Sequence, residues 1–273
     1  MPENARNALQ IAHHRILLLG ETGSGKTTQI LSLPGKKYVH AFESNAILTL
    51  RGHDVDYDEY LPTTVSAAAT SLTKGKGDPR STVSSDVYLH FEREFDDRLK
   101  HGFFDAYDWI CFDSATTLLD LIMDRILTIN GRFGQWPNQD DYGPQMMAFT
   151  NLCRTLVALG KGVLMTGHLE VKQDDKTKAI ANRPMMTGRL AAKIPLLFSD
   201  VFYTDAEVDK DGNSMYRLQT KPSGINKTIR TSIRGLDLYQ DVTLNFAEPL
   251  HKQGLGGILA WEAKQLSLNQ PQT

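Results

Sequence analysis

The stretch GETGSGKT at residues 20–27 constrains the fold of this 273-residue chain more than any other part of the sequence. It matches the pattern GxxxxGK[ST], follows the apolar run RILLL, and precedes a segment that favours a helix. In this context the glycines allow positive φ, and backbone N–H groups converge on phosphate oxygens at the positive end of the helix. The sequence therefore predicts a buried strand, a phosphate-binding loop and a helix.

The residue types in this loop indicate the ligand that it holds. We expect Lys26 to reach the β and γ phosphates of a nucleoside triphosphate and the Thr27 hydroxyl to ligate magnesium. ATP and Mg²⁺ are therefore the predicted cofactors. The predicted nucleotide-binding residues are Gly20, Glu21, Thr22, Gly23, Ser24, Gly25, Lys26, Thr27 and Thr28.

A second metal ligand is expected at the end of another apolar strand. Asp113 closes the run WICFD and is predicted to support the magnesium shell; the other interpretation is a residue that caps the next helix. Ser114 follows it and is the better cap. Because no glutamate stands beside Asp113, the residue that orients the attacking water is expected elsewhere in the chain.

Two further strand ends carry candidates for that chemistry. Glu43 follows the run KYVHAF, and a carboxylate there is predicted to be the catalytic base. His168 follows GVLMTG, a strand expected between the first strand and the Asp113 strand, and is predicted to sense the γ-phosphate. The alternatives are a solvated glutamate and a structural histidine. The predicted catalytic residues are Lys26, Glu43, Asp113 and His168.

Strand-like runs alternate with helical patterns along the chain. Helices are expected near 26–33, 86–101, 115–130, 144–159, 187–198 and 257–267, and strands at 15–19, 37–42, 108–113, 162–167 and 200–206. A small hairpin is expected at 169–186 around Asp174-Asp175, and Asp211-Gly212 indicates another between two strand-like runs. This order predicts an α/β fold with a mainly parallel sheet, flanked by helices, and an antiparallel extension at one edge.

The domain organisation follows from the same patterns. Residues 1–14 are expected to be an N-terminal extension, 15–240 the main domain, and 241–273 a tail with a short helix. Within the main domain, residues 52–85 are rich in polar and turn-forming residues, so they are expected to be an irregular excursion.

Composition limits the class of protein. With 41% hydrophobic and 23% charged residues a packed core is expected, and a net charge of −2 does not by itself indicate nucleic acid binding. Cys111 and Cys153 lie in apolar runs and are expected to be buried and free, as in a reducing cytoplasm. No secretion signal or membrane-spanning run is seen, so no membrane partner is predicted.

Several motifs together resemble those of phage-encoded RecA-like ATPases of the Sak single-strand annealing class, over about residues 15–235. They are GETGSGKTT after RILLL, the acidic strand end Phe42-Glu43, WICFDSATTL, GVLMTGHLE, and RPMMTGRLAAKIPLLFSDVFY. The resemblance implies a RecA-like P-loop NTPase core, with Glu43 as the base and His168 as the γ-phosphate switch. It also implies the cytoplasm of an infected or lysogenic bacterial host.

The resemblance further implies an oligomer, a ring or a helix, in which a neighbouring subunit supplies positive charge in trans. Such a cation stabilises charge on the transferred phosphoryl group. Lys221 and either Arg230 or Arg234 match the region where members of the class carry these cations; the other interpretation is solvated surface charge.

In this architecture two loops are expected to face single-stranded DNA. Aromatic side chains stack on unpaired bases while cations follow the phosphates. The first loop offers Arg132, Phe133 and Trp136, and the second offers Lys172, Lys176, Lys178, Arg183 and Arg189. Acidic residues in both loops leave a plain solvated surface as the alternative.

The leading functional hypothesis is a DNA-dependent ATPase of phage recombination. It would bind single-stranded DNA and promote annealing or strand pairing, with a single-strand-binding protein as a further partner. The alternatives are a P-loop kinase acting on a small acceptor, a helicase or packaging motor, and a nucleotide-gated scaffold or loader without productive hydrolysis.

Overall fold

The computed structural model describes residues 13–61, 86–173 and 177–268. An eight-stranded sheet with the order β10-β9-β8-β1-β5-β4-β2-β3 forms its centre, beside a separate two-stranded ribbon. The sheet contains β1 (Arg15–Gly20), β2 (Lys37–Ala41), β3 (Asp56–Glu59), β4 (Trp109–Asp113), β5 (Gly162–Gly167), β8 (Asp200–Val208), β9 (Ser214–Gln219) and β10 (Tyr239–Asp241). The ribbon consists of β6 (Leu169–Gln173) and β7 (Ile180–Pro184).

The pairing of the strands confirms the predicted fold class. From β8 to β3 each strand is parallel to its neighbours, whereas β9 pairs antiparallel with β8, and β10 with β9. Strand β5 lies between β1 and β4, as predicted. The predicted hairpin turn at Asp211-Gly212 joins β8 to β9, with Gly212 at a φ of 87°. The carboxyl ends of β1, β5, β4 and β2 therefore meet at one edge, where ligands bind in open α/β sheets.

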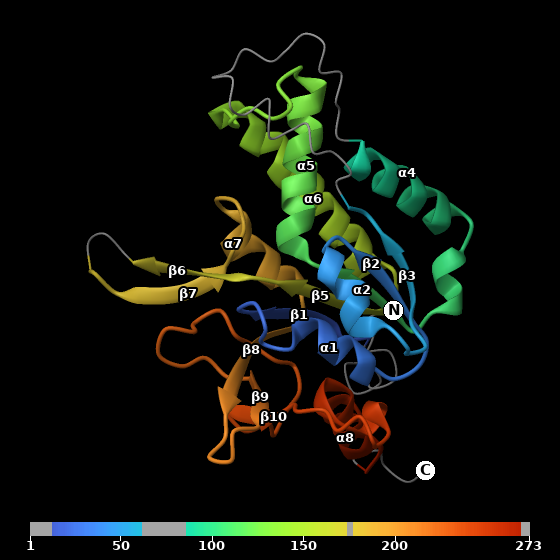
Figure 1. The fold of residues 1–273 in the computed structure, drawn as a ribbon, viewed down its shortest axis with the longest axis vertical. Helices are drawn as coiled ribbons and strands as arrows, with labels where there is room; N and C mark the ends of the chain where they lie inside the picture. Colours follow the sequence, from blue (N-terminus) through green and yellow to red (C-terminus); the bar gives the residue numbers. More distant parts are fainter. Residues whose placement is uncertain (1–12, 62–85, 174–176, 269–273) are drawn as a thin grey trace, which may run out of the picture.

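Helices cover both faces of the sheet (Figure 1). One face carries α4 (Val87–Lys100), α5 (Ala115–Ile129), α6 (Tyr142–Ala158) and α7 (Leu190–Lys193); the other carries α1 (Lys26–Gln29), α2 (Ser44–Leu50) and α8 (Gly254–Leu268). Short 3₁₀ helices are η2 (Ile30–Ser32), η3 (Phe103–Ala106), η4 (Gln139–Asp141), η5 (Ile194–Leu197) and η6 (Leu250–Lys252). Successive residues of β1 point to opposite faces, so that Leu17 and Leu19 join one apolar core, and Ile16 and Leu18 join the other.

The prediction of an irregular excursion over residues 52–85 is wrong for its first part. Asp56–Glu59 form β3, which pairs in parallel with β2 at the edge of the sheet. Its sequence DYDE has no apolar alternation, so the strand arises from backbone pairing and from bonds that Lys36 and Tyr107 make to Asp56. Helix α2, over residues 44–50, was also not predicted. Residues 62–85 lie outside the described residues.

The two ends of the chain bear on the predicted domain boundaries. Residues 1–12 of the predicted N-terminal extension and residues 269–273 of the predicted tail lie outside the described residues. In the described part, β10 crosses the predicted boundary at residue 240, and α8 buries Leu255 in the same apolar core as Ile16 and Leu18. The segment after residue 240 thus packs against the sheet that carries the phosphate loop.

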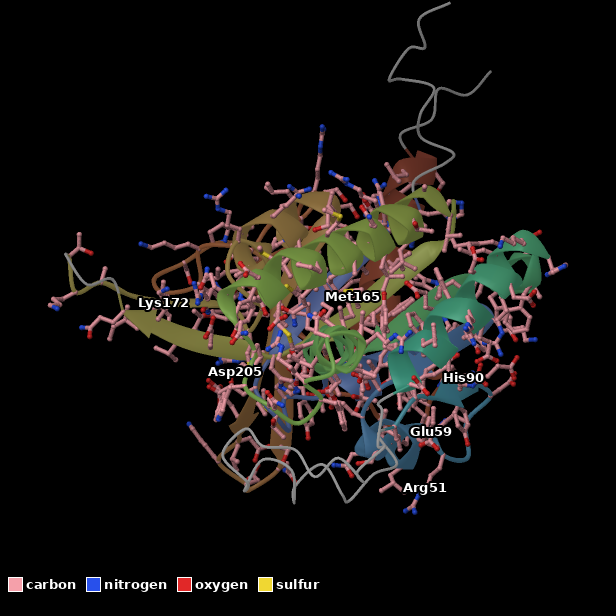
Figure 2. The ribbon with its side chains drawn as sticks, turned by 90° about the horizontal axis from the view of Figure 1, so that it is seen from above. Arg51, Glu59, His90, Met165, Lys172 and Asp205 are labelled. Carbon is pink, nitrogen blue, oxygen red and sulfur yellow. The ribbon has the colours of Figure 1, made fainter. Side chains whose placement is uncertain are left out.

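The ribbon of β6 and β7 projects from the body of the molecule (Figures 1 and 2). Its antiparallel strands confirm the predicted hairpin at 169–186, although the Asp174-Asp175 turn lies outside the described residues. In Figure 2 Lys172 lies on this ribbon, well away from Met165 in the central sheet.

The remaining predictions about the interior also agree with the structure. Cys111 and Cys153 are buried and free. Within the three described ranges, no helix has the length and apolar composition needed to cross a membrane.

Candidate nucleotide site

A cavity of about 280 Å³ lies at the carboxyl ends of the central strands. Four different segments bring the predicted catalytic residues Lys26, Glu43, Asp113 and His168 to its wall. The rest of the lining comes from Thr22, Gly23, Gly25, Thr27, Thr28, Asn45, Ala46, Thr49 and Tyr216. The strand order explains this convergence, because β1, β5, β4 and β2 are neighbours and all run in the same direction.

The phosphate loop adopts a backbone that only glycine tolerates well. Gly23 and Gly25 have φ values of 82° and 83°, in the left-handed region. A side chain at Gly20 would collide with the hydroxyl oxygens of Ser24 and Thr204. These two hydroxyls are hydrogen-bonded to each other at 2.8 Å, which ties the loop to β8. Gly20, Glu21 and Ser24 do not line the cavity.

Lys26 is the buried cation of the site. Its Nζ donates to the carbonyl oxygens of Gly20 at 3.0 Å and Glu21 at 2.7 Å, within its own loop. Burial lowers the pKa of Lys26, and the carboxylates of Asp113 and Glu43 act against that shift. A phosphate in the cavity would offer this ammonium stronger, charged acceptors than the two carbonyls.

Thr27 and Asp113 form the candidate metal site. The Thr27 hydroxyl donates to Asp113 Oδ2 at 2.7 Å, and Thr166 donates to Oδ1. Burial raises the pKa of Asp113, while the bonds from Thr166 and Thr27 act against it. A carboxylate and a hydroxyl beside a phosphate loop are the oxygen ligands that Mg²⁺ prefers, with further places left to water and phosphate. The residues therefore fit the predicted ion.

Glu43, which also lines the cavity, is held in place by three hydrogen bonds. Its Oε1 atom lies 3.2 Å from His168 Nε2 and 3.1 Å from Thr117 Oγ1, and the Ser114 hydroxyl donates to the same oxygen. These hydrogen bonds lower the pKa of Glu43 to about 2, and the bond from His168 has the largest effect. Burial alone would raise the pKa of this carboxyl. Because Glu43 is ionised, Nε2 of His168 must carry the proton in this contact.

Several residues of the site were not predicted from the sequence. Asn45 and Thr49 reach the cavity from α2, a helix without a strong apolar pattern. Tyr216 lies against the loop from β9, close enough that a side chain at Gly25 would meet its ring at 2.9 Å. Ser114 was expected only as a helix cap, and Thr117 was not singled out. No local pattern marks these positions, because the sheet and its connections bring them to the loop.

The three predicted trans cations do not line the cavity of their own chain. Lys221 and Arg234 are exposed. The backbone of Arg230 bridges to Val201, at the beginning of β8, and its guanidinium donates to the Phe198 carbonyl. Their predicted role in a neighbouring subunit stays a prediction.

The two predicted DNA loops lie in different places. Arg132 and Trp136 follow the end of α5 that is remote from the sheet (Figure 1); Trp136 is 91% exposed and Arg132 pairs with Asp141. On the ribbon and after it, Lys172, Lys178 and Arg189 are exposed, while Arg183 pairs with Glu170. Phe133 is half-buried, and Lys176 lies outside the described residues. DNA binding by these residues stays a prediction.

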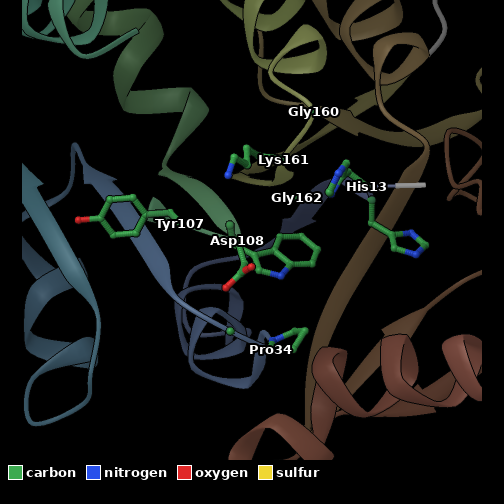
Figure 3. A pocket seen from close by; sticks show the side chains of 10 residues that line it. His13, Pro34, Tyr107, Asp108, Gly160, Lys161 and Gly162 are labelled. Atoms are coloured by element: carbon green, nitrogen blue, oxygen red, sulfur yellow. The ribbon is translucent and has the colours of Figure 1, made fainter. Parts of the chain in front are cut away.

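A second hollow, of about 500 Å³, opens at the amino ends of the central strands (Figure 3). It is lined by residues that precede strands, among them His13, Asp108 and Lys161. Asp108 accepts from the backbone N–H of Lys36, and Lys161 donates to the Asp105 carbonyl. Asp108 and Lys161 are thus already hydrogen-bonded within the chain. This hollow is separate from the phosphate loop, which lies at the opposite ends of the strands.

Comparison with known proteins agrees with the geometry of the loop. A family model described as an AAA domain matches residues 12–228. The chain belongs to this AAA domain family. The matched part of this AAA domain protein includes the phosphate loop, Glu43, Asp113 and His168, which supports nucleotide binding at the cavity.

Solved structures similar to this AAA domain protein include three with low identity. The flagellar accessory protein FlaH from Methanocaldococcus jannaschii is 15% identical over 80% of this chain and 83% of that chain, with a TM-score of 0.36. An ATPase of the type III secretion system of pathogenic bacteria is 12% identical over 73% of this chain and 53% of its own, with a TM-score of 0.36. The Legionella pneumophila ATPase DotB is 10% identical over 80% of this chain and 48% of its own, with a TM-score of 0.28. The chain spans about half the length of these two ATPases. No curated protein matches the chain.

Proposed function

We propose that this AAA domain protein hydrolyses ATP and uses the cycle to bind single-stranded DNA and promote annealing or strand pairing in phage recombination. The observation that carries the ATPase part is the convergence of Lys26, Asp113, Glu43 and His168 on one cavity beside the phosphate loop. The DNA part is supported by the motif resemblance, by the exposure of Trp136 in one predicted loop and by the exposed cations Lys172, Lys178 and Arg189 in the other. The proposed location is the cytoplasm of a bacterial host.

The residues of the cavity divide the chemistry between them. The loop backbone and Lys26 would hold the β and γ phosphates, while Thr27 and Asp113 would hold Mg²⁺, which would supply charge neutralisation for the transferred phosphoryl group. Glu43 orients the attacking water, for which an ionised carboxylate serves as acceptor. His168, which is hydrogen-bonded to Glu43, would couple the presence of the γ-phosphate to the position of that carboxylate.

The charge of the cavity supports an oligomer. Among the described residues, Lys26 is the one lysine or arginine that lines it. Phosphoryl transfer is accelerated when a second cation reaches the transferred group, and a neighbouring subunit is a common source of it. We therefore propose a ring or helical assembly in which Lys221, Arg230 or Arg234 of one copy serves the site of the next. A single-strand-binding protein is the proposed further partner.

One set of measurements tests this function. ATP hydrolysis is measured with and without single-stranded DNA at low salt, beside annealing of complementary strands and the mass of the oligomer in the same buffer. We expect DNA to stimulate hydrolysis, and Lys26→Ala to reduce the rate by about 10²-fold or more. Absence of DNA binding at low salt contradicts the DNA role, whereas absence of phosphate release contradicts the ATPase role.

Trp136 gives a sharper test of the DNA surface. Stacking of one base on an aromatic side chain contributes about 1–3 kcal/mol, so Trp136→Ala should weaken binding of single-stranded DNA about tenfold or more. Phe246→Ala is the matched control, because Phe246 is also exposed, at 59%, and belongs to neither predicted DNA loop. Equal affinities of the wild type and Trp136→Ala, measured by fluorescence anisotropy, would remove this loop from the proposed interface.

A further inference from the structure

Two hydroxyl groups contact Glu43 without belonging to the nucleotide cavity. Thr117 Oγ1 lies 3.1 Å from Glu43 Oε1, and Ser114 Oγ donates to the same oxygen. Glu43 and His168 line the cavity, but neither Ser114 nor Thr117 does. The two hydroxyls therefore contact the carboxylate from behind, and a bound nucleotide would have no direct contact with them.

The contacts use one oxygen of the carboxylate. Ser114, Thr117 and His168 all bond Oε1, and within the described ranges Oε2 has no hydrogen-bond partner. A carboxylate held through one oxygen keeps the other free to accept a hydrogen bond from water. The direction of the free oxygen is then set by the groups that hold Oε1.

The beginning of α5 explains why these hydroxyls are available. Ser114 is the N-cap, and its side chain accepts from the Thr117 N–H at 3.4 Å. A capping box would place Glu or Gln at the position of Thr117, three residues after the cap. Here that position carries a hydroxyl, and the carboxylate comes from Glu43 at the end of β2. The positive end of the 15-residue helix also favours an anion at this place.

We propose that Thr117, together with Ser114, is a positioning residue that aims the Glu43 carboxylate at the attacking water from the first turn of α5. This role rests on the proposed hydrolysis of ATP, and it assigns a specific task to a residue that touches neither nucleotide nor metal. Thr117 acts through Glu43. Loss of its hydroxyl should therefore raise the free energy of the transition state for hydrolysis and leave the affinity for the bound nucleotide unchanged.

Three variants test the role of Thr117. Thr117→Val removes the hydroxyl and preserves the shape of the side chain, whereas Thr117→Ser restores the hydroxyl. Thr155→Val is the matched control, since Thr155 is an exposed helical threonine in α6 whose hydroxyl bonds the carbonyl of Asn151. We expect kcat for ATP to fall roughly tenfold to a hundredfold in Thr117→Val, with KM unchanged, because a misdirected base costs rate and not binding. Thr117→Ser should recover most of the rate.

A second measurement separates positioning from a purely structural effect. The affinity for ADP with aluminium fluoride, which mimics the transferred phosphoryl group, should fall in Thr117→Val by the same factor as kcat. The affinity for a non-hydrolysable ATP analogue should stay at the wild-type value, and the melting temperature reports on folding. A rate and analogue affinity equal to those of the wild type would overturn the positioning role while hydrolysis itself persists. A wild-type protein that releases no phosphate would instead overturn the proposed ATPase function and this role with it.

Discussion

At the scale of single residues, the site keeps its charged groups in place through bonds within the chain. Lys26 is held by two carbonyl oxygens, Asp113 by two threonine hydroxyls, and Glu43 by hydroxyls and an imidazole. Groups arranged in this way need little reorganisation during a reaction, which is the main source of electrostatic stabilisation in enzymes. The cost is that each side chain depends on its neighbours, some of which, such as Thr166 and Ser114, do not line the cavity.

Glu43→Gln tests the residue that the proposed mechanism needs most. The amide keeps the size of the side chain, and its oxygen still accepts from Ser114 and Thr117, but it removes the negative charge that orients water. We expect kcat to fall by about 10²-fold or more, while nucleotide affinity changes little. Glu59→Gln, at the exposed end of the neighbouring β3, makes the same chemical change away from the cavity and should keep the wild-type rate. Unchanged phosphate release in Glu43→Gln would rule out Glu43 as the base.

At the scale of elements, the C-terminal helix is attached to the helix of the phosphate loop. Gln29, at the end of α1, donates to the carbonyl of Val242, and its side-chain oxygen accepts from the Leu255 N–H at 2.9 Å. Leu255 itself is fully buried in the core beneath α1. Helix α8 therefore supports the helical segment that follows the phosphate loop.

Leu255→Ala measures how much this support contributes. Truncation of a buried leucine removes apolar contacts and leaves a cavity, so we expect a loss of about 2–5 kcal/mol in the free energy of unfolding. Leu268→Ala, in the same helix but 69% exposed, should cost less than about 0.5 kcal/mol. Urea denaturation of both variants provides the comparison; equal midpoints would show that α8 does not stabilise the domain.

At the scale of the whole molecule, the pKa values of two histidines, His40 and His14, are shifted in opposite directions by the fold. Burial among aromatic rings lowers the pKa of His40 to about 3, and neither ring nitrogen has a hydrogen-bond partner among the described residues. Burial alone would also lower the pKa of His14, but bonds to Asp200 and Glu262 outweigh it and raise the pKa to about 9. The first histidine must stay neutral in the fold, and the second is held protonated.

The combined contribution of these two histidines to the stability of the fold should therefore be largest near pH 6.5, the ordinary pKa of histidine. Below it the unfolded chain binds a proton at His40 that the fold excludes, so stability falls toward pH 3. Above it the fold keeps a proton at His14 that the unfolded chain releases, so stability falls by on the order of 2 kcal/mol toward pH 9.

Two variants test which histidine causes the loss of stability on each side of this maximum. Their melting temperatures are measured between pH 5 and 9. His14→Gln should flatten the alkaline limb, and His40→Leu should flatten the acid limb and raise stability at pH 5, since it removes a buried polar group without a partner. An alkaline limb of full height in His14→Gln would contradict this assignment.

The phosphate loop, the strand ends that carry Asp113, Glu43 and His168, and most of the alternation of strands and helices could be predicted from the sequence, whereas α2 and β3 could not. The predicted features are local: an apolar run, a glycine pattern and a polar residue at a strand end lie within a few residues of each other. The parallel sheet with its antiparallel extension followed from the same alternation.

Which residues meet around these strand ends depends on the three-dimensional fold. Ser114 and Thr117 reach Glu43 across 71 and 74 residues, and Tyr216 reaches the loop from a strand on the far side of β8. Strand β3 forms from a polar segment because β2 offers it an open edge. Such contacts depend on which strands are neighbours in the sheet, and that long-range pairing leaves no periodic pattern near any one of the residues that it joins.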